Sequence, residues 1–575
     1  MLVYGDGELQ ADPTELRAAV LDALSEGLAA PPGLARHQRL VGAFILAGEL
    51  AQGLADARFA HAGADGWSSA DITESKFLLA LAKAVALSWE SGFAAPPTLP
   101  SGWPELLAAL AGPSPITVRR PEGYAFYALY PEAYYAAAKR SGLSSRTRII
   151  GIRSIGTSLA AMVAASLGAG PPITLRPTGH PFERRPEISP ELATHILNDP
   201  EADFAIVDEG PGLSGSSFGG VADWLVEHGI DEERLHFFPG HSGPLGPQAR
   251  PEHRARWERR PRHVVDFDAL ILHAGRPEHQ LESWLSDLLG PLQAPLEEIS
   301  GGAWRKLHPA PPPPADGRLE RRKFFAHADG QRFLVKFAGL GVDAERKLVR
   351  ASKLAAAGFS PRPVGLCHGF LVEEWQEGTP LDSSTGDRAA LIERLVDYIA
   401  FRIQHLPVYT PGADPSALAA MAVANTREAL GESRAAGLEA ALADIDHLPF
   451  HPVDTDNRMH AWEWLVTPNG RLLKTDALDH SGAHDLIGPQ DPAWDIIGAM
   501  VELDLSSEER DALVQRIGQL TGRSIDHRLL QTMEPCYLAF QLGLWTFAAG
   551  TGDELCNEQA GRYARLLEEL IEMQR

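Results

Sequence analysis

The chain has 575 residues, of which 44% are hydrophobic and 22% charged; these proportions are typical of globular proteins, and the length predicts several domains. A formal net charge of −24 excludes a broad surface for binding nucleic acid, but it leaves room for a local basic pocket that holds a small phosphorylated metabolite. The three cysteines are scattered along the chain, so we expect neither a disulfide framework nor a zinc knuckle.

Residues 1–112 are predicted to be helical and carry no recognisable chemical motif. Thr14 is the expected cap of a first helix, and a second helix is expected to open at Thr73, each before leucines at helical spacing. The first residues lack the basic and apolar regions of a signal peptide, and no apolar run approaches the roughly 20 residues that cross a bilayer. We therefore expect a cytoplasmic protein with no membrane partner, whose N-terminal helices serve in packing or in forming an oligomer.

From about residue 113 the pattern changes to short apolar runs that alternate with helical stretches. Arg148–Ile152 and Phe204–Val207 are predicted as buried strands, and each precedes a predicted helix, Ser158–Leu167 and Val221–His228. A third strand is predicted at His263–Phe267. Alternation of this kind indicates a parallel sheet covered by helices.

Chemistry-bearing residues follow two of these strands. The second strand ends in adjacent acids, Asp208 and Glu209, and a Gly-Pro-Gly turn and the small residues of 213–217 come next. Carboxylates at the carboxyl edge of a parallel sheet can accept hydrogen bonds from sugar hydroxyls, and small residues at a helix N-terminus can close around a phosphate. The turn at Gly151–Ser158 has a similar setting after the first strand, and Leu175–Arg185 is a basic stretch between the two strands.

These features resemble the fingerprint of type I phosphoribosyltransferases over roughly residues 115–275, with one extra residue between the acids and the small residues. The resemblance implies a Rossmann-like parallel-sheet domain over 113–284 that binds phosphoribosyl pyrophosphate (PRPP). It gives Asp208 and Glu209 catalytic roles at the ribose. It also implies a pyrophosphate loop, a mobile basic loop and a phosphate cradle, whose PRPP-binding residues are Arg153, Ser154, Gly156, Thr157, Arg176, His180, Arg184, Arg185, Leu213, Ser214, Gly215, Ser216 and Ser217.

A proline-rich stretch at 309–314 has two interpretations. Consecutive prolines form a stiff extended segment, which is either a linker between domains or an insertion in a β-hairpin. The residues after it, Arg321–Phe337, predict a hairpin that turns at Asp329-Gly330. Beyond Leu391 the chain is predicted to be mostly helical, with a loop-rich stretch at 448–495.

Several motifs in this half point to phosphoryl transfer. Lys336 lies alone within an apolar strand, where it can reach nucleotide phosphates if an acid orients it, and Glu345 in the following helix is the expected partner. Further along, Asp456-Asn457-Arg458 precedes a strand that ends at Asp476. The segment Asp491–Ile497 then opens a helix with two acids four residues apart.

The motifs resemble those of aminoglycoside phosphotransferase-like kinases. The resemblance implies a bilobal α+β domain over 285–575, with an N-lobe at about 285–378 and a C-lobe at about 379–575, and it favours the hairpin insertion. Asp456 is then the catalytic base, and Asp476 and Asp479 hold Mg²⁺. The asparagine expected five residues after the base is replaced by Ala461. His460, Glu463 or Asp479 are candidates to substitute for it. The ATP-binding residues implied are Gly301, Gly302, Lys336, Glu345, Glu373, Glu374 and Arg458.

The sequence therefore predicts an α/β multi-domain protein with an N-terminal helical region, a phosphoribosyltransferase-like domain and a kinase-like domain. We expect a bifunctional metabolic enzyme that uses PRPP, ATP and Mg²⁺, with one small-molecule acceptor for each reaction. In the alternative hypothesis, the first domain only senses PRPP or a nucleotide and regulates the second, and one or both domains are not catalytic.

Overall fold

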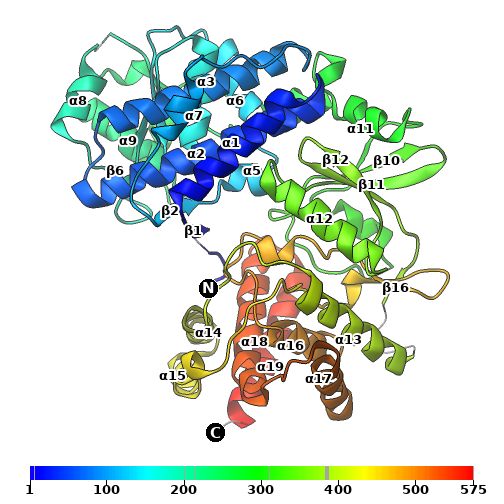
Figure 1. The fold of residues 1–575 in the computed structure, drawn as a ribbon. Helices are drawn as coiled ribbons and strands as arrows, with labels where there is room; N and C mark the ends of the chain where they lie inside the picture. The colour runs from blue at the N-terminus through cyan, green and yellow to red at the C-terminus, as the bar shows by residue number, and fades with distance from the viewer. Residues whose placement is uncertain (6, 200, 213, 310, 382–386, 574–575) are drawn as a thin grey trace.

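The computed structural model describes residues 1–575 except 6, 200, 213, 310, 382–386 and 574–575. The fold is mixed α/β. In Figure 1 the N-terminal helices and a parallel sheet form the upper part, an antiparallel sheet with helix α12 lies beside them, and a helical lobe lies below.

The N-terminal helices are attached to the region that follows them. Strand β1 pairs antiparallel with β2, so the two ends of this region meet. Asp12 caps the first helix, and Ser68 forms a capping box with Asp71 at the third. The predicted caps were therefore wrong: Thr14 and Thr73 lie inside helices, because better-placed side chains a few residues earlier accept the free N–H groups. The elements are β1 (Glu8–Ala11), α1 (Pro13–Ala29), α2 (Leu34–Ala62), α3 (Ser69–Glu90), α4 (Trp103–Ala108) and β2 (Ile116–Arg119).

Helix α2 is long and apolar enough to cross a membrane by length and composition alone. Within the protein, however, 78% of its most apolar window is buried. It packs against α1 and α3 and also contacts α7 of the following region. A helix that is apolar on most of its surface is explained by burial among other helices.

The parallel sheet has the strand order β4-β3-β7-β8. Two predicted strands are confirmed within it, β3 and β7, and the helices after them are confirmed with earlier starts. The strands are β3 (Arg148–Ile152), β4 (Ile173–Leu175), β7 (Phe204–Val207) and β8 (Leu235–Phe238), and a small hairpin is formed by β5 (Pro177–Thr178) and β6 (Arg185–Pro186). The helices are α5 (Glu122–Phe126), α6 (Pro131–Arg140), α7 (Gly156–Leu167), α8 (Pro190–Leu197), α9 (Ser216–Glu227), α10 (Pro251–Arg259) and α11 (Leu281–Leu289).

The third predicted strand was wrong. Residues 263–266 are irregular, and Phe267 begins a short helical turn. The shorter apolar run of β8 takes the place beside β7, and the chain at 261–263 makes only two backbone hydrogen bonds to Phe237 before it turns away. Tertiary pairing therefore decided between two apolar runs with similar strand propensity.

The antiparallel sheet has five strands in the order β12-β13-β11-β10-β9. The hairpin between β10 and β11 turns at Asp329 and Gly330, whose φ angles are 47° and 71°, as predicted for an Asp-Gly turn. Because β9 pairs with β10 in the same sheet, the proline-rich stretch lies inside a hairpin connection and is not a linker. The elements are β9 (Glu297–Glu298), β10 (Lys323–Ala328), β11 (Gln331–Phe337), α12 (Val342–Ala356), β12 (Pro363–Cys367) and β13 (Phe370–Glu374).

The last 200 residues form the helical lobe, which confirms the predicted change at Leu391. The irregular stretch at 448–495 is also confirmed, and it contains two short strands of a small sheet. The strands are β14 (Thr379–Pro380), β15 (Trp464–Val466) and β16 (Leu472–Lys474). The helices are α13 (Arg388–His405), α14 (Pro415–Leu430), α15 (Glu432–Ala441), α16 (Ala493–Glu502), α17 (Ser507–Thr521), α18 (His527–Ala549) and α19 (Glu554–Met573).

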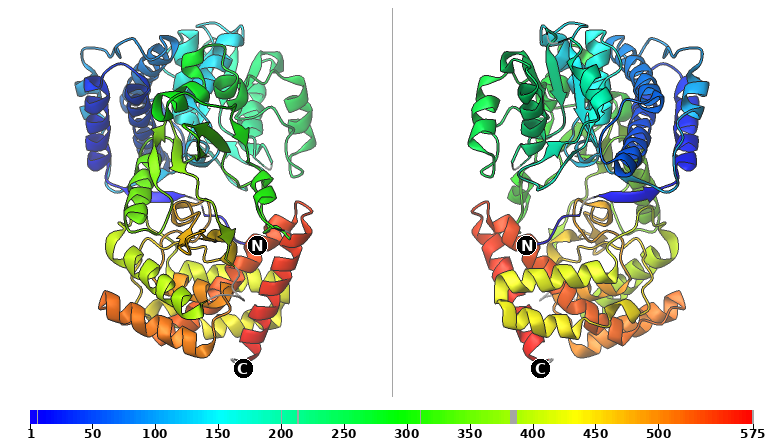
Figure 2. Two further views of the ribbon diagram at one scale, coloured as in Figure 1. Left: turned by 90° about the vertical axis from the view of Figure 1, so that its right-hand side faces the viewer. Right: turned by 90° about the vertical axis from the view of Figure 1, so that its left-hand side faces the viewer.

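The hydrophobic core is continuous across residues 112 and 284, where the sequence suggested boundaries. One cluster of buried side chains includes Phe44 of α2, Val207 of β7 and Phe337 of β11. A second cluster fills the helical lobe and takes in Val3 from the start of the chain. Both views in Figure 2 place the N-terminus at the junction of the upper and lower parts, so the first residues bridge the upper part and the helical lobe.

Candidate active sites

The first candidate site lies at the carboxyl edge of the parallel sheet. Strands β3 and β7 are adjacent and parallel, so helices α7 and α9 begin at the same edge and direct their free N–H groups there. A Cβ at position 156 would lie 2.6 Å from the carbonyl oxygen of Val207. Glycine at the start of α7 therefore lets this helix N-terminus approach the end of β7.

Asp208 and Glu209 occupy this edge directly after β7. The Tyr134 hydroxyl donates a hydrogen bond to the Asp208 carbonyl (2.8 Å), and the Gly123 N–H donates to the Glu209 carboxylate (2.6 Å). Burial raises the pKa of Asp208 to about 7. Burial and the neighbouring Asp208 carboxylate raise the pKa of Glu209 to about 8. At neutral pH the Glu209 carboxyl is then mostly protonated and the Asp208 carboxyl partly so. Such a pair can both donate and accept hydrogen bonds.

Two arginines assigned to PRPP binding are held in place by acids of the N-terminal region. Arg153 forms ion pairs with Asp56 (2.9 Å) and with Asp65. Arg176 pairs with Asp56, its backbone N–H donates to Asp65 (2.7 Å), and its guanidinium donates to the Arg153 carbonyl (2.7 Å). Asp56 lies on α2 and Asp65 just after it, about one hundred residues upstream. No sequence motif pointed to these two acids, because the N-terminal region carries none.

The basic stretch forms the β5–β6 hairpin, which lies against the start of α9. The hydroxyls of Ser214 and Ser216 donate to the Pro181 carbonyl (3.1 and 2.7 Å). Arg184 approaches the Ser217 hydroxyl at 3.5 Å. The hairpin therefore occupies the donors of the small-residue loop in this conformation, and a phosphate bound there must displace it. His180 is exposed, Gly215 is the N-cap residue directly before α9 with a φ of 61°, and Leu213 lies outside the described residues.

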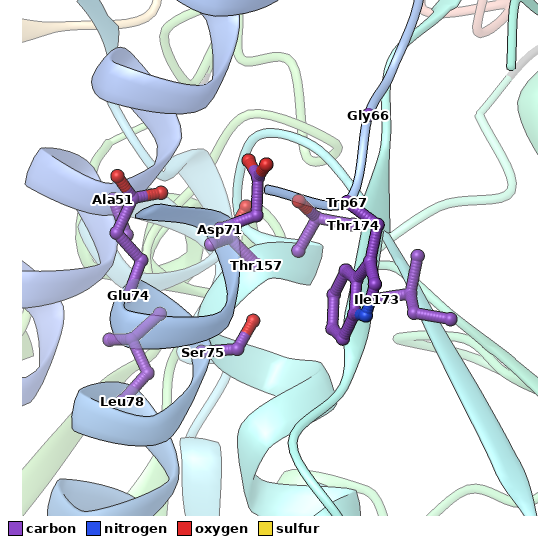
Figure 3. A pocket seen from close by; sticks show the side chains of 10 residues that line it. All are labelled: Ala51, Gly66, Trp67, Asp71, Glu74, Ser75, Leu78, Thr157, Ile173 and Thr174. Atoms are coloured by element: carbon purple, nitrogen blue, oxygen red, sulfur yellow. The ribbon is translucent and has the colours of Figure 1, made fainter. Parts of the chain in front are cut away.

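Two other assigned residues contact different parts of this region. Arg185 is exposed and pairs with Glu227, near the C-terminal end of α9, at 3.4 Å. Thr157 lines a small polar pocket between α3, α7 and β4, opposite Asp71 and Glu74 of α3 (Figure 3). Among the described residues its buried hydroxyl has no hydrogen-bond partner, and its backbone N–H donates to the Ser154 carbonyl.

The acid pair predicts a pH-dependent stability. Unfolded carboxyl groups titrate near 4, whereas these two titrate at about 7 and 8 in the folded protein. Between about pH 4 and 8 the folded state therefore holds protons that the unfolded state has released, and their contribution to stability is lost as pH rises through this window. We expect the melting temperature of the wild type to fall between pH 5 and 8 by a few degrees more than that of the Asp208→Asn/Glu209→Gln double variant. Thermal unfolding at constant ionic strength measures this difference, and parallel curves would contradict it.

The second candidate site lies between the antiparallel sheet and the helical lobe. Lys336 of β11 forms ion pairs with Asp476 (2.6 Å) and with Asp479. Glu345 is exposed, so its predicted pairing with Lys336 was wrong: it sits on the first turn of α12, and two acids after β16 reach the lysine instead. Lys347 of the same helix pairs with Asp479 at 2.5 Å. Burial raises the pKa of Asp476, but the Lys336 charge outweighs it and brings this pKa to about 2.

Asp456 is 1% exposed and held by charged and polar neighbours. The Tyr398 hydroxyl donates to its carboxylate, and Lys474 lies 3.4 Å away. Burial opposes ionisation, yet Lys474 holds the pKa of Asp456 well below its usual value. The Asp495 carboxylate accepts the backbone N–H groups of Asp456 and Asn457 (2.7 and 2.9 Å). Asp495 thus fixes the Asp456 loop, a role the sequence motif did not reveal.

Of the remaining residues assigned to ATP, Glu373, Glu374 and Arg458 line the same space, whereas Gly301 and Gly302 do not. Glu373 and Glu374 end β13, and burial raises the pKa of Glu373 to about 7. Gly301 and Gly302 have φ angles of 60° and 82°, and the Gly302 N–H donates to Glu320 (3.0 Å). Arg458 lies 3.8 Å from Asp485.

A cavity of about 400 Å³ lies between the antiparallel sheet and the helical lobe, a size in the range of small-molecule sites. Asp456 lies behind its wall, 3.7 Å from His480. Its wall is formed by both lobes and by aromatic residues. It includes Trp304, Lys323, Lys336, Glu373, Glu374, Trp375, Arg458, Trp462, Glu463, Asp476, Asp479, His480 and Trp545. Phe126 and Tyr127, from the region of the parallel sheet, also line it.

The carboxylates of this cavity suit Mg²⁺, which prefers hard oxygen ligands. Single ligand atoms of Asp456, Glu463 and His480 lie within 4.8 Å of one another. The side-chain oxygen of Asn457 is buried and, in the described part of the chain, has no hydrogen-bond partner. Of the candidates to replace the missing asparagine, Glu463 lies in this group and pairs with Lys474, and His460 is bonded to the Tyr563 hydroxyl (3.1 Å).

A short path of contacts joins the two sites. The Glu209 carboxylate accepts the Gly123 N–H, and the adjacent Glu122 carboxylate lies 2.8 Å from His484 at the cavity wall. Arg120, on the same segment, pairs with Asp343 of α12 (2.6 Å) and donates to the Gly482 carbonyl (2.9 Å).

Replacing Lys336 is expected to weaken nucleotide binding. A charged hydrogen bond is worth about 1.5–3 kcal/mol, so Lys336→Ala should lower the affinity for Mg-ATP about 10- to 100-fold. Lys353→Ala is the matched control, since this exposed lysine of α12 bonds only to the His405 carbonyl among the contacts described. Calorimetric titration with a non-hydrolysable ATP analogue measures both, and equal affinities would contradict the placement of Lys336.

No protein-family model and no curated protein matches the chain. Among solved structures it is similar to choline kinase LicA from Streptococcus pneumoniae, with 14% identity over 50% of this chain and 98% of that chain and a TM-score of 0.35. It is also similar to macrolide 2′-phosphotransferase MphH from Brachybacterium faecium, with 18% identity, coverages of 49% and 96% and a TM-score of 0.33. A choline/ethanolamine kinase family protein from Mesorhizobium loti shows 15% identity, coverages of 49% and 89% and a TM-score of 0.31.

Proposed function

We propose that the chain transfers a phosphoryl group from ATP to a hydroxyl of a small molecule in the cavity between the antiparallel sheet and the helical lobe. The observation that carries the proposal is that Lys336, Asp476 and Asp479 line one cavity, with Asp456 buried 3.7 Å behind His480 of its wall. These residues come from segments up to 143 positions apart, and they supply a cation for phosphates, carboxylates for a metal and a carboxylate for the acceptor.

Each group has a distinct task in this proposal. Asp456, kept ionised by Lys474, accepts the proton of the acceptor hydroxyl or orients it for attack. Lys336 holds the ATP phosphates after it exchanges part of its pairing with Asp476 and Asp479. Bound Mg²⁺ would neutralise phosphate charge, and Asp476, Asp479 and Glu463 are the residues that would hold it. The aromatic wall favours an acceptor with an apolar surface beside its hydroxyl.

We also propose that the carboxyl edge of the parallel sheet binds PRPP with Mg²⁺ and transfers its phosphoribosyl group to a second small molecule, or runs the reverse reaction on a ribose 5-phosphate glycoside. Support comes from the acid pair after β7 and from the two helix N-termini at one edge of the sheet. The hairpin over the small-residue loop would move away when a phosphate binds there. Arg153 and Arg176, already oriented by Asp56 and Asp65, would hold the pyrophosphate without a large ordering cost.

The contacts between Glu209, Gly123, Glu122 and His484 favour a second candidate function, in which PRPP or a nucleotide at the sheet edge regulates the cavity. A ligand that changes the protonation of Glu209 would act on its hydrogen bond with the Gly123 N–H. The adjacent Glu122, which contacts His484, would transmit the change to the cavity wall. Regulation requires that each ligand bind differently in two states of this connection.

The experiment that tests these proposals uses the full-length chain with ATP or PRPP, Mg²⁺ and a panel of small hydroxyl and amine acceptors. Acceptor-dependent release of ADP supports the kinase, and acceptor-dependent release of pyrophosphate supports the phosphoribosyl transfer. PRPP that binds tightly without turnover, and that alters ADP release, supports the regulatory function. If ATP neither binds nor is consumed, the kinase assignment is wrong.

A further inference from the structure

A third cluster of ligand-type side chains lies in the core and belongs to neither candidate site. His37 of α2, Glu132 of α6 and His368, in the turn between β12 and β13, are each 0% exposed. One nitrogen or oxygen atom of each lies within 4.8 Å of the others. A buried carboxylate beside two imidazoles costs free energy unless every polar atom has a partner.

The geometry of the three side chains fits a small tetrahedral ion. The Glu132 Oε1 atom lies 2.8 Å from His37 Nε2 and 3.7 Å from His368 Nε2. Around a tetrahedral zinc ion with bonds of 2.0–2.2 Å, ligand atoms lie about 3.4 Å apart, and the two distances bracket that value.

Three polar atoms of the cluster lack a hydrogen-bond partner among the residues that the structure describes: Glu132 Oε2 and both ring nitrogens of His368. A hydrogen bond from the His37 Nε2–H group to the Glu132 carboxylate explains the contact between these two side chains. It does not explain His368, because 3.7 Å is too long for a hydrogen bond. A bound cation would give partners to the Glu132 and His368 atoms that face it.

The surroundings hold the ligands as a metal site requires. His37 Nδ1 lies 3.1 Å from the Ser88 hydroxyl, an arrangement that leaves Nε2 directed at Glu132, and such outer hydrogen bonds fix the ring of a metal-bound histidine. The backbone N–H of His368 donates to the Gln38 side-chain oxygen (3.0 Å), and the backbone carbonyl of His368 accepts a hydrogen bond from the Tyr130 hydroxyl (2.7 Å). Gln38 is next to His37 in the chain, and Tyr130 lies two residues before Glu132.

We propose that His37, Glu132 and His368 bind one zinc ion. Two imidazoles and one carboxylate form a donor set that Zn²⁺ accepts, and Mg²⁺ or Ca²⁺ would require more oxygen ligands. The ion joins helix α2, helix α6 and the antiparallel sheet, which come from three separate parts of the chain. Its binding free energy would therefore add to the stability of the folded protein.

The first test measures zinc in the full-length protein, produced with zinc in the medium and purified without chelators or a histidine tag. We expect elemental mass spectrometry to find one zinc per chain in the wild type and no zinc in Glu132→Gln or His368→Gln. His279→Gln is the matched control, because this buried histidine bonds to the Trp89 carbonyl (2.8 Å) in the same core. Glu463→Gln controls for metal in the ATP cavity, and both controls should keep the zinc.

The second test uses the wild type alone, in case the variants do not fold. Exchange of zinc for Co²⁺ should give the strong visible absorption of a tetrahedral site, and a chelator should lower the melting temperature reversibly. Wild-type protein without stoichiometric zinc after reconstitution, zinc that persists in a folded Glu132→Gln variant, or a melting temperature insensitive to chelation would each overturn the proposal.

Discussion

We expect Asp456→Asn to lower the phosphoryl-transfer rate roughly 100- to 10,000-fold, the range that removal of a general base produces. The asparagine keeps the shape of the side chain and its contact with the Tyr398 hydroxyl, but it cannot take the acceptor proton. Because the proposed mechanism assigns Asp456 to the acceptor and not to the nucleotide, the affinity for Mg-ATP should change little. Steady-state ADP formation with the best acceptor of the panel, together with calorimetric ATP binding, separates the two effects.

The matched control is Asp397→Asn, an exposed acid beside Tyr398 on α13, which should leave the rate unchanged. Loss of ATP binding in Asp456→Asn, with an intact melting curve, would show that Asp456 holds the nucleotide and does not act on the acceptor. An unchanged rate would remove Asp456 from the reaction.

The second large effect is expected at the sheet edge. Asp208→Asn should lower kcat/KM for PRPP about 100-fold, since it removes hydrogen bonds to a charged group worth together on the order of 3 kcal/mol. Burial keeps the pKa of Asp208 at about 7, so the wild-type rate should rise with pH through neutrality as the carboxylate forms. The variant should lose that rise. Pyrophosphate release as a function of pH measures both quantities.

Asp22→Asn, a change of an exposed acid on α1, is the control for the removal of one charge. If Asp208→Asn binds PRPP as the wild type does and the wild type shows no turnover with any acceptor, the regulatory function is favoured. If neither protein binds PRPP, the assignment of the sheet edge is wrong.

Local sequence patterns predicted the elements that depend only on neighbouring residues, such as apolar strands and tight turns. The strands Arg148–Ile152 and Phe204–Val207 are buried apolar runs between helices, and the Asp329-Gly330 turn follows from the positive φ angles that these residues accept. The pattern failed at Thr14 and Thr73, where earlier side chains cap the helices. It also failed at 263–267, where the choice of sheet partner was made by packing and not by propensity.

Motif spacing grouped Lys336, Asp456 and Asp476 in one site. In the structure Lys336 and Asp476 line one cavity, and Asp456 lies behind His480 of its wall. Their partners could not be found in this way. Lys336 pairs with two acids after β16 and not with Glu345 in the next helix, and Asp495 holds the Asp456 loop by its backbone. Such contacts depend on how distant segments approach, which spacing does not encode.

The sequence by itself determined the two buried strands, the acids that end the second of them and the Asp329-Gly330 turn. These features obey local rules of hydrophobic period and backbone conformation. Only the tertiary structure decided that the N-terminal helices share a core with both sheets, that Asp56 and Asp65 orient Arg153 and Arg176, and that His37, Glu132 and His368 meet. The physical reason is that burial and electrostatic pairing act between neighbours in space. These neighbours lie about a hundred or more positions apart in the chain.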